Sequence, residues 1–278
     1  MGDEVALSRH RVAVLRSAVL IPFVLGACVS PARSWWRHAA DAGFDSTVVA
    51  GDPFRHVILE GRGRASRALH VYLDGDGTPW DSGGPSVDPT PRNTLVLDLM
   101  RLDGSPRLFL GRPCYHGLVD DVGCAPALWT SERYSDRVVS SMAAALTRHL
   151  SARGVERLAF IGYSGGGSLA MLLASRFTQT VAVVTVAANL DIDAWASHHR
   201  YLPLAGSLNP ASQPPLARPV YRRHYVGARD RVVPPEIVAR GSTHDDEVVV
   251  FPDFDHVCCW PRVWPSIIEG LTRAIEPS

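Results

Sequence analysis

The chain has 278 residues, of which 46% are hydrophobic and 20% charged, a composition that suits one sizeable globular domain with a full core. Its 28 basic and 28 acidic residues cancel and neither sign forms a long block, which excludes a nucleic-acid-binding surface built on a clustered basic excess. The sequence contains no lysine, which excludes serine–lysine dyads and Schiff-base lysines, so a catalytic base must be sought first among the 11 histidines.

The N-terminal region is typical of an export signal. Three arginines precede an apolar run at residues 17–27, which is too short to span a bilayer as a stable helix. The run leads into LGAC, the pattern of a bacterial lipobox, with Cys28 as the lipidated residue. We therefore expect a lipoprotein signal peptide at 1–27, a tether and entry segment at 28–53, and an exported, membrane-anchored protein. Val29 does not resemble an inner-membrane retention signal, which favours the outer membrane, and the alternative is an ordinary signal peptide with an incidental cysteine.

From residue 54 onward, strand-like and helix-like segments alternate. The expected strands are 54–60, 68–73, 107–110, 158–161, 181–186, 222–226 and 247–251, and the expected helices are 92–102, 135–150, 168–175 and 263–275. This alternation favours an α/β fold with a mostly parallel sheet flanked by helices on both faces. Residues 54–278 would form this domain. Residues 191–218, which fit no period and contain four prolines, would form a small irregular cap.

Four cysteines remain after Cys28, and export would place them in an oxidising compartment. Cys114 and Cys124 bracket a segment with two glycines that would let it fold back, so we expect a disulfide between them. Cys258 and Cys259 are adjacent, and neighbouring Cα atoms lie ~3.8 Å apart, closer than a relaxed disulfide prefers. A strained vicinal bridge and two reduced buried thiols both remain open for this pair.

The sequence LAFIGYSGGGSLAMLL, which begins at Leu158, places one serine among four glycines between an apolar strand and an apolar helix. Residues 162–166 match G-x-S-x-G, the nucleophile elbow, in which a strained turn exposes the serine hydroxyl and bulky neighbours would not fit. Open α/β sheets bind ligands beyond the carboxyl ends of their strands, where this serine would lie. We therefore identify Ser164 as a nucleophile. The alternative is a tight turn whose serine caps the helix.

A serine nucleophile needs a base, and the base needs a carboxylate that orients it. Asp230 lies at the tip of the loop after the sixth expected strand, and His256 follows the last one, so both belong to the same sheet edge as Ser164. We therefore predict a catalytic triad of these three residues, with a surface-turn role as the alternative for Asp230. Asp191 and Asp193 are rivals for the acid, but they fall in the expected cap.

An acyl-transfer site also needs hydrogen-bond donors for an oxyanion. The backbone N–H of Gly165 is the first expected donor, because it opens a helix whose dipole favours negative charge. The second donor is expected in the DGDG loop at 74–77, as the N–H of Asp76 or Gly77. The same loop could instead begin a calcium site, but it lacks later acidic ligands at suitable spacing, so no metal is expected.

The elbow, the Asp230 loop and the His256 loop, in this order and spacing, resemble the α/β-hydrolase superfamily over residues 54–275. The segments YLDGDG, GRPC, WTSERYS and DHVCCW also resemble a group of uncharacterised bacterial exported α/β hydrolases. The resemblance implies a serine hydrolase, and the sequence indicates no cofactor. In one departure, Asp74-Gly75 stands where relatives have His-Gly, which separates the chain from typical lipases.

These features predict cleavage of carboxylic esters with short acyl groups. The loops expected around the pocket, 74–93, 114–124 and 191–218, are more polar than the tunnel of a long-chain lipase. Carboxylates near the oxyanion loop would repel anionic substrates. The expected partners are a small-molecule ester and, through Cys28, the membrane, with no nucleic acid. The alternatives are a peptidase, amidase or acyltransferase acting on cell-envelope molecules, or a non-catalytic exported lipoprotein.

Overall fold

The computed structural model describes residues 30–64, 66, 68–151, 153–216 and 219–276. The expected signal peptide and lipidated Cys28 lie outside these residues. Within the described ranges, no helix combines the length and the apolar character needed to cross a membrane.

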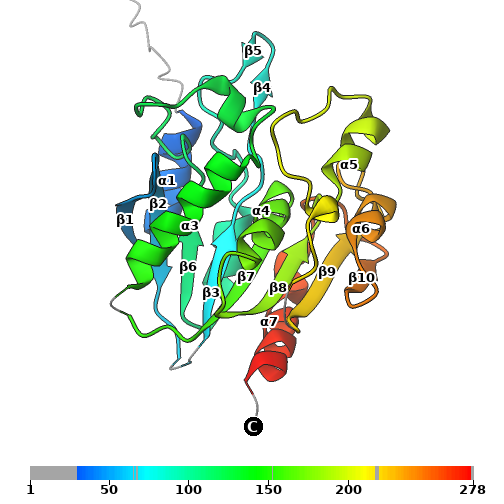
Figure 1. Ribbon diagram of the computed structural model, residues 1–278. Helices are drawn as coiled ribbons and strands as arrows, with labels where there is room; N and C mark the ends of the chain where they lie inside the picture. The colour runs from blue at the N-terminus through cyan, green and yellow to red at the C-terminus, as the bar shows by residue number, and fades with distance from the viewer. Residues whose placement is uncertain (1–29, 65, 67, 152, 217–218, 277–278) are drawn as a thin grey trace, which may run out of the picture.

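An eight-stranded sheet runs through the middle of the domain in the order β1-β2-β6-β3-β7-β8-β9-β10 (Figure 1). Its strands are β1 (Asp45–Ala50), β2 (Arg55–Gly61), β3 (Ala68–Leu73), β6 (Arg107–Leu110), β7 (Arg157–Tyr163), β8 (Thr180–Val186), β9 (Tyr221–Gly227) and β10 (Glu247–Phe251). The pairs β1–β2 and β2–β6 are antiparallel, and all pairs from β6 to β10 are parallel. The parallel strands therefore all end at one edge of the sheet, which is the upper edge in Figure 1 and the edge where such sheets bind ligands. A small ribbon of β4 (Trp80–Asp81) and β5 (Gly84–Pro85) rises from the loop after β3.

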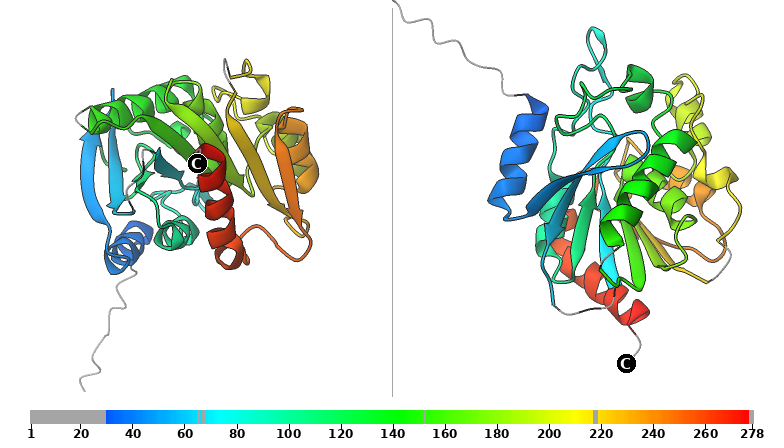
Figure 2. Two further views of the ribbon diagram at one scale, coloured as in Figure 1. Left: turned by 90° about the horizontal axis from the view of Figure 1, so that it is seen from below. Right: turned by 60° about the vertical axis from the view of Figure 1, so that its left-hand side comes forward.

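Helices cover both faces of this sheet (Figure 2), as the sequence predicted. Helices α1 (Pro31–Asp41), α2 (Leu95–Leu102) and α7 (Trp260–Ile275) pack on one face. Helices α3 (Asp136–Leu150), α4 (Gly165–Ala174) and α6 (Pro235–Gly241) pack on the other. The short elements that remain are α5 (Ile192–His199) and the 3-10 turns η1 (Pro126–Trp129) and η2 (Pro210–Ser212).

The central strand β7 shows why the sheet needs both layers. Its side chains alternate between the two cores, with Ala159 and Ile161 facing the layer of α2 and α7, and Leu158 and Phe160 facing the layer of α3 and α4. All four are buried. A strand that is buried on both faces has a continuous apolar sequence. Its rigid packing supports the turn that follows it.

Residues 31–50, expected as part of a tether and entry segment, form a helix and an edge strand of the domain. Ser30 caps α1 by accepting the N–H of Arg33, and Pro31 occupies the first helical turn, where proline is well tolerated. Trp35 is 1% exposed and its ring centroid lies 5.2 Å from that of Phe109 in β6. Strand β1 then pairs with β2 over six residues. These elements therefore belong to the domain, and its boundary lies before residue 54.

The expected cap is also more regular than predicted. The described part of residues 191–218 contains helix α5 as well as η2. Helix α5 contacts the loop after β9, because Trp195 Nε1 donates to the Val232 carbonyl at 2.8 Å and His199 Nε2 lies 2.9 Å from the same oxygen. The cap therefore packs against the loop that carries Asp230.

Candidate active site

Ser164 stands at the turn between β7 and α4, at the carboxyl edge of the sheet. Its backbone has φ 53° and ψ −125°, a conformation that residues with a side chain rarely adopt. Its N–H donates to Val186 O of the neighbouring strand at 2.9 Å, and its own carbonyl accepts the N–H of Gly167 at 2.9 Å. Ser164 occupies the N-cap position of α4, yet its hydroxyl makes no capping hydrogen bond. The helix-cap alternative therefore does not account for this serine.

The glycines beside Ser164 are required by close packing. A Cβ at Gly162 would clash with the Gly166 carbonyl, and a Cβ at Gly166 would clash with the carbonyl of Leu73 at the end of β3. Backbone, rather than a flexible side chain, lies in the way at both positions. The strained turn can therefore form only where these side chains are missing.

Ser164, His256 and Asp230 form one continuous hydrogen-bonded chain. His256 Nε2 lies 3.1 Å from Ser164 Oγ, and His256 Nδ1 lies 2.8 Å from Asp230 Oδ2. The Asp230 side chain is fully buried, and the His256 side chain is 15% exposed. When Nδ1 donates its proton to the carboxylate, Nε2 presents its lone pair to the serine hydroxyl. The geometry is that of a nucleophile, its base and an orienting acid.

Two loops with their own hydrogen bonds hold the acid and the base. Asp230 follows β9, and its other oxygen, Oδ1, accepts the backbone N–H groups of Val232 and Val233, both at 2.8 Å. His256 follows β10, where the adjacent Asp255 accepts two backbone N–H groups of the next turn. Those hydrogen bonds lower the pKa of Asp255, so it stays ionised and keeps the turn closed. Both loops are thus set before any substrate arrives.

The loop after β3 carries the residues expected for the oxyanion site. The backbone of Gly75 lies beside the nucleophile, since a Cβ there would stand 3.3 Å from Ser164 Cβ. Among the hydrogen bonds that join described residues, none uses the backbone N–H of Gly165, Asp76 or Gly77 as its donor. These three groups are therefore available to a substrate oxygen.

The side chain of Asp76 was expected to line a polar pocket and to repel anionic substrates, but it lies in a largely buried group with two arginines and a tyrosine. Oδ1 accepts from Arg112 Nη2 at 2.7 Å and Oδ2 from Arg133 Nη1 at 2.8 Å, while Tyr134 Oη lies 2.7 and 2.6 Å from the two oxygens. Burial alone would raise the pKa of Asp76, but the two arginines and Tyr134 hold it below its usual value. The carboxylate is therefore ionised and fully paired.

The pKa of Asp74, two residues earlier, is shifted in the opposite direction. It is 4% exposed, and burial raises its pKa to about 7, although the N–H of Gly75 and the nearby Arg112 lower it in part. The loop therefore presents one carboxyl that is neutral below that pH and, at Asp76, one carboxylate outnumbered by two guanidinium groups. The expectation that this loop repels anionic substrates loses its basis.

Comparison with known proteins places this architecture. No protein-family model and no curated protein matches the chain. Solved structures similar to it include an esterase from Pyrococcus furiosus (17% identity, TM-score 0.60, 85% of this chain and 96% of that one). They also include a hydrolase from Agrobacterium vitis, described as putative (15%, 0.57, 84% and 99%), and a Xanthomonas campestris protein described as an α/β serine hydrolase without lid (12%, 0.54, 84% and 96%). The chain has the α/β-hydrolase fold.

Within this α/β-hydrolase fold, the rival acids hold the cap together. Asp191 Oδ1 accepts the N–H of Ala194 at the start of α5, and Asp193 accepts from Asn209 Nδ2 at 2.9 Å. His256 is hydrogen-bonded to Asp230 instead. In the described part of the chain, no three His, Cys, Asp or Glu residues are grouped to hold a metal ion.

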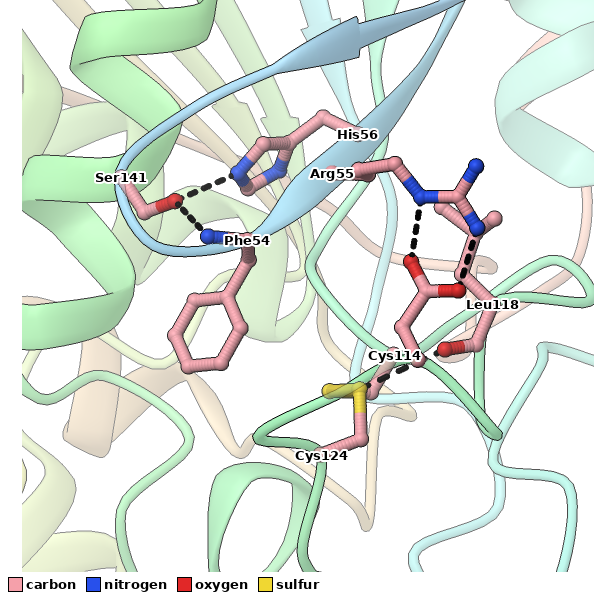
Figure 3. Close-up of a disulfide and its surroundings, with 8 residues drawn as sticks. Phe54, Arg55, His56, Cys114, Leu118, Cys124 and Ser141 are labelled. Carbon is pink, nitrogen blue, oxygen red and sulfur yellow. Dashed lines mark hydrogen bonds and ion pairs between the residues drawn. A yellow bond between two sulfur atoms is a disulfide. The ribbon is translucent and has the colours of Figure 1, made fainter.

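The four cysteines of the described residues form two disulfides. Cys114 and Cys124 are joined by a disulfide, with their Cα atoms 5.7 Å apart (Figure 3), and Cys258 and Cys259 are joined next to His256. Arg55, which is labelled in Figure 3, forms an ion pair with Asp121 that ties the first disulfide loop to β2. The predicted Cys114–Cys124 pairing is thus the one in the structure.

A second serine–histidine contact lies near this disulfide but differs from the first. His56 Nε2 stands 2.8 Å from Ser141 Oγ (Figure 3). His56 Nδ1 stands 2.9 Å from the Gly111 carbonyl. His56 is fully buried, and burial lowers its pKa to about 4. Ser141 Oγ also accepts the N–H of Phe54. This pair is a core contact between α3, β2 and the loop after β6.

Proposed function

We propose that the protein is a serine hydrolase that cleaves carboxylic esters through an acyl-enzyme. The observation that carries this proposal is the chain of contacts from Ser164 Oγ through the ring of His256 to the buried Asp230. It lies at the carboxyl edge of the sheet, where this architecture binds ligands. Proteins of similar structure that are described as an esterase and as a serine hydrolase support the same class.

In the acylation step, His256 Nε2 takes the proton of Ser164 Oγ while the oxygen attacks the ester carbonyl carbon. The carbonyl oxygen becomes an oxyanion, and the N–H groups of Gly165 and of Asp76 or Gly77 stabilise it. The bond to the alcohol oxygen then breaks, and His256 returns the proton to that leaving group.

In the deacylation step, His256 removes a proton from water, which attacks the acyl carbon. The Ser164 oxygen leaves with that proton, and the free acid departs. Asp230 holds the Nδ1 proton and stabilises the imidazolium in both steps. An amine as leaving group would make the protein an amidase or peptidase, and a hydroxyl acceptor in place of water would make it an acyltransferase; these are the alternatives.

We propose short acyl groups as the preferred substrates. Three large apolar side chains in the loops at this edge, those of Trp80, Tyr201 and Leu202, are 56%, 57% and 86% exposed, so they do not form a buried wall. A long acyl chain gains about 0.8 kcal/mol for each methylene that it buries, so it needs such a wall to bind well. Acyl groups of about two to six carbons would lose little binding free energy in the absence of such a wall.

We further propose that the mature protein is exported and anchored to a membrane, with a weak preference for the outer membrane, by lipid on Cys28. The Cys114–Cys124 disulfide supports export, because structural disulfides persist in oxidising compartments.

The decisive experiment is labelling with a fluorophosphonate probe, which reacts with an activated serine. We expect the wild-type protein and the control Ser197→Ala, an exposed serine of α5, to be labelled, and Ser164→Ala to remain unlabelled while still folded. His256→Ala should slow labelling and turnover by several orders of magnitude, since no lysine can replace the base. Persistent labelling of Ser164→Ala would refute the site, and an unlabelled, inactive wild type would favour the non-catalytic alternative.

The substrate is tested with p-nitrophenyl esters of increasing acyl length beside matched anilides. We expect kcat/KM to be highest at about two to six carbons and to fall beyond, with weak or no anilide cleavage. A maximum for long chains would contradict the proposed pocket. Faster cleavage of anilides than of esters would establish the amidase alternative.

A further inference from the structure

Four side chains, those of Asp76, Arg112, Arg133 and Tyr134, form a buried group that we call the carboxylate clamp. The two arginine side chains are 3% and 5% exposed, that of Asp76 is 17% exposed, and Tyr134 is fully buried. The donors come from segments 36 to 58 positions away in the sequence. The clamp therefore joins the loop after β3 to the loop after β6 and to the turn before α3.

The clamp lies directly against the nucleophile elbow. A Cβ at Gly165 would clash with Asp76 Oδ1 and with the hydroxyl of Tyr134. The carboxylate is thus packed against the Cα of the residue whose N–H is the first expected oxyanion donor. Any shift of Asp76 would change the distance between the two sides of the oxyanion site.

The backbone of the same loop is held as well. Tyr115 Oη donates to the Asp76 carbonyl at 2.9 Å, and Arg112 Nη2 also lies 3.4 Å from the Asp74 carbonyl. Side-chain and main-chain contacts therefore fix residues 74–76 at several points. Catalytic donors need this kind of support, because a displacement of about 1 Å can reduce a rate by about 100-fold.

The buried charges of the carboxylate clamp would contribute little to the free energy of unfolding if stability were their only role. Two guanidinium groups face one carboxylate, so the buried group carries a net charge of plus one. Buried ion pairs contribute little net stability compared with apolar side chains of the same size. A positive charge beside an oxyanion site does favour the negative charge that develops there.

We propose that the Asp76 carboxylate is a positioning group for the oxyanion site: by binding Arg112, Arg133 and Tyr134 it fixes the N–H groups of residues 76 and 77 opposite the N–H of Gly165. This inference rests on the proposed function, and it assigns the side chain of Asp76 a role distinct from that of its backbone. Asp76 then acts through the loop, and it need not touch the substrate.

The first test compares Asp76→Asn with the double variant Asp76→Asn/Arg133→Gln. The single variant leaves two unbalanced guanidinium groups, whereas the double variant restores the net charge of plus one without restoring the clamp. We expect thermal stability to fall in the single variant and to recover in part in the double variant. In both variants kcat should fall by about 100-fold while KM changes little, because only the transition state uses the oxyanion donors.

The second test uses a boronic acid inhibitor. Ser164 Oγ adds to the trigonal boron, His256 takes the serine proton, and the adduct is a tetrahedral anion whose oxygen occupies the oxyanion site. The affinity for the boronic acid should fall by the same factor as kcat in both variants, whereas the affinity for the product alcohol should not change. A purely structural role of Asp76 would move the two affinities together.

A pair of tyrosine variants supplies the matched control. Tyr134→Phe removes a hydroxyl that binds Asp76, and Tyr72→Phe removes an equally buried hydroxyl that donates to Asp103 at 2.7 Å in the core between β3 and α7. We expect similar losses of stability, with kcat about 10-fold lower for Tyr134→Phe alone.

Wild-type kcat and boronate affinity in the two Asp76 variants would overturn the inference, and so would an equal loss of kcat in both tyrosine variants. Either result leaves the proposed function standing as long as activity depends on Ser164. Activity that persists in Ser164→Ala would instead refute the proposed function itself.

Discussion

Asp74 and Asp76 stand two positions apart in one loop, yet the pKa of Asp74 is raised and that of Asp76 is lowered. The Asp76 carboxylate has two guanidinium groups within hydrogen-bonding distance, whereas Asp74 is buried and its carboxyl accepts the N–H of Gly75. Sequence distance therefore says little about protonation here. The neighbours that decide it come from elsewhere in the chain.

The raised pKa of Asp74 predicts a particular dependence of stability on pH. The carboxyl ionises at about 3.8 in the unfolded chain and at about 7 in the folded one, so between these values the folded state binds the extra proton. This contribution to stability is full at acidic pH and is lost as the pH rises towards 7.

We therefore expect the difference in Tm between Asp74→Asn and wild type to shift in favour of the variant from pH 5 to pH 8. Asp81→Asn, an exposed aspartate that also accepts a nearby backbone N–H, is the control and should show no such shift; an equal shift there would contradict the assignment.

Gly165 predicts a second effect at single-residue scale. Gly165→Ala would push a methyl group into the Asp76 carboxylate and the Tyr134 hydroxyl, and kcat should fall by about 100-fold or more. Gly270→Ala in α7 meets open space and should stabilise the protein by about 1 kcal/mol with unchanged kcat. Ester hydrolysis and thermal unfolding of both variants measure this, and an active Gly165→Ala protein would show that the elbow tolerates a side chain.

Ser164, Asp230 and His256 could be located from the sequence because each follows a recognisable strand, and parallel strands end together. Asp76 was expected as a backbone donor for the same reason. Its clamp could not be found, since no periodicity links it to Arg112, Arg133 and Tyr134. Only the folded arrangement of three loops brings these side chains together.

At the scale of elements, the loop after β6 is the main support of the site. It supplies Arg112 and Tyr115 to the loop of Asp76, and it contains two non-glycine residues with positive φ, Cys114 and His116. The Thr90 hydroxyl accepts the N–H of His116 at 2.8 Å. An irregular segment of this kind keeps its shape only when its surroundings determine it, and the disulfide is one such constraint.

Removing that disulfide should therefore affect both stability and rate. We expect Cys114→Ala/Cys124→Ala to lose about 2.5–3 kcal/mol of unfolding free energy, the entropy of closing the loop, and to show a lower kcat because Arg112 and Tyr115 are less firmly placed. Arg55→Gln, which breaks the exposed ion pair with Asp121, should lower stability far less and leave kcat unchanged, because surface ion pairs contribute little. Denaturant unfolding and ester hydrolysis measure the two effects, and a fully active double alanine variant would show that the loop holds itself.

Elements were predictable where burial imposes a pattern, and were missed where it does not. The apolar runs of β7 and β8 announce two-sided burial, whereas the side chains of β1 are mostly exposed because it is an edge strand. Helix α4 begins at Gly165, three residues earlier than expected, because the elbow leads straight into it. Helix α1 was not predicted, because its residues were interpreted as part of a tether and entry segment.

At the scale of the whole molecule, α1 links the expected anchor to the catalytic edge. The N–H of Ala32 donates to Asp88 in the loop after β3 at 3.0 Å, and Trp36 Nε1 donates to the His116 carbonyl at 2.8 Å. Both contacts reach loops that support the proposed oxyanion site. The first turn of α1 therefore lies close to the carboxyl edge of the sheet.

The anchor itself is tested by Cys28→Ala. We expect the variant to move from the membrane fraction to the soluble fraction, since the lipid on Cys28 is the only strong membrane attachment that we propose. Its kcat on a soluble ester should equal that of wild type, because Cys28 lies outside the catalytic machinery. A wild-type protein that is recovered in solution with residue 29 or a later one as its free N-terminus would refute the lipobox interpretation.

The docking of α1 then has a consequence for how such an enzyme would meet its substrates. With lipid on Cys28, only three residue steps separate the anchor from Pro31. Such a segment spans about 10 Å at full extension. A catalytic edge held so close to the bilayer would encounter substrates only within a thin layer at the membrane surface. Esters carried by envelope molecules would be presented at a high effective concentration, whereas freely diffusing esters would gain nothing from the anchor.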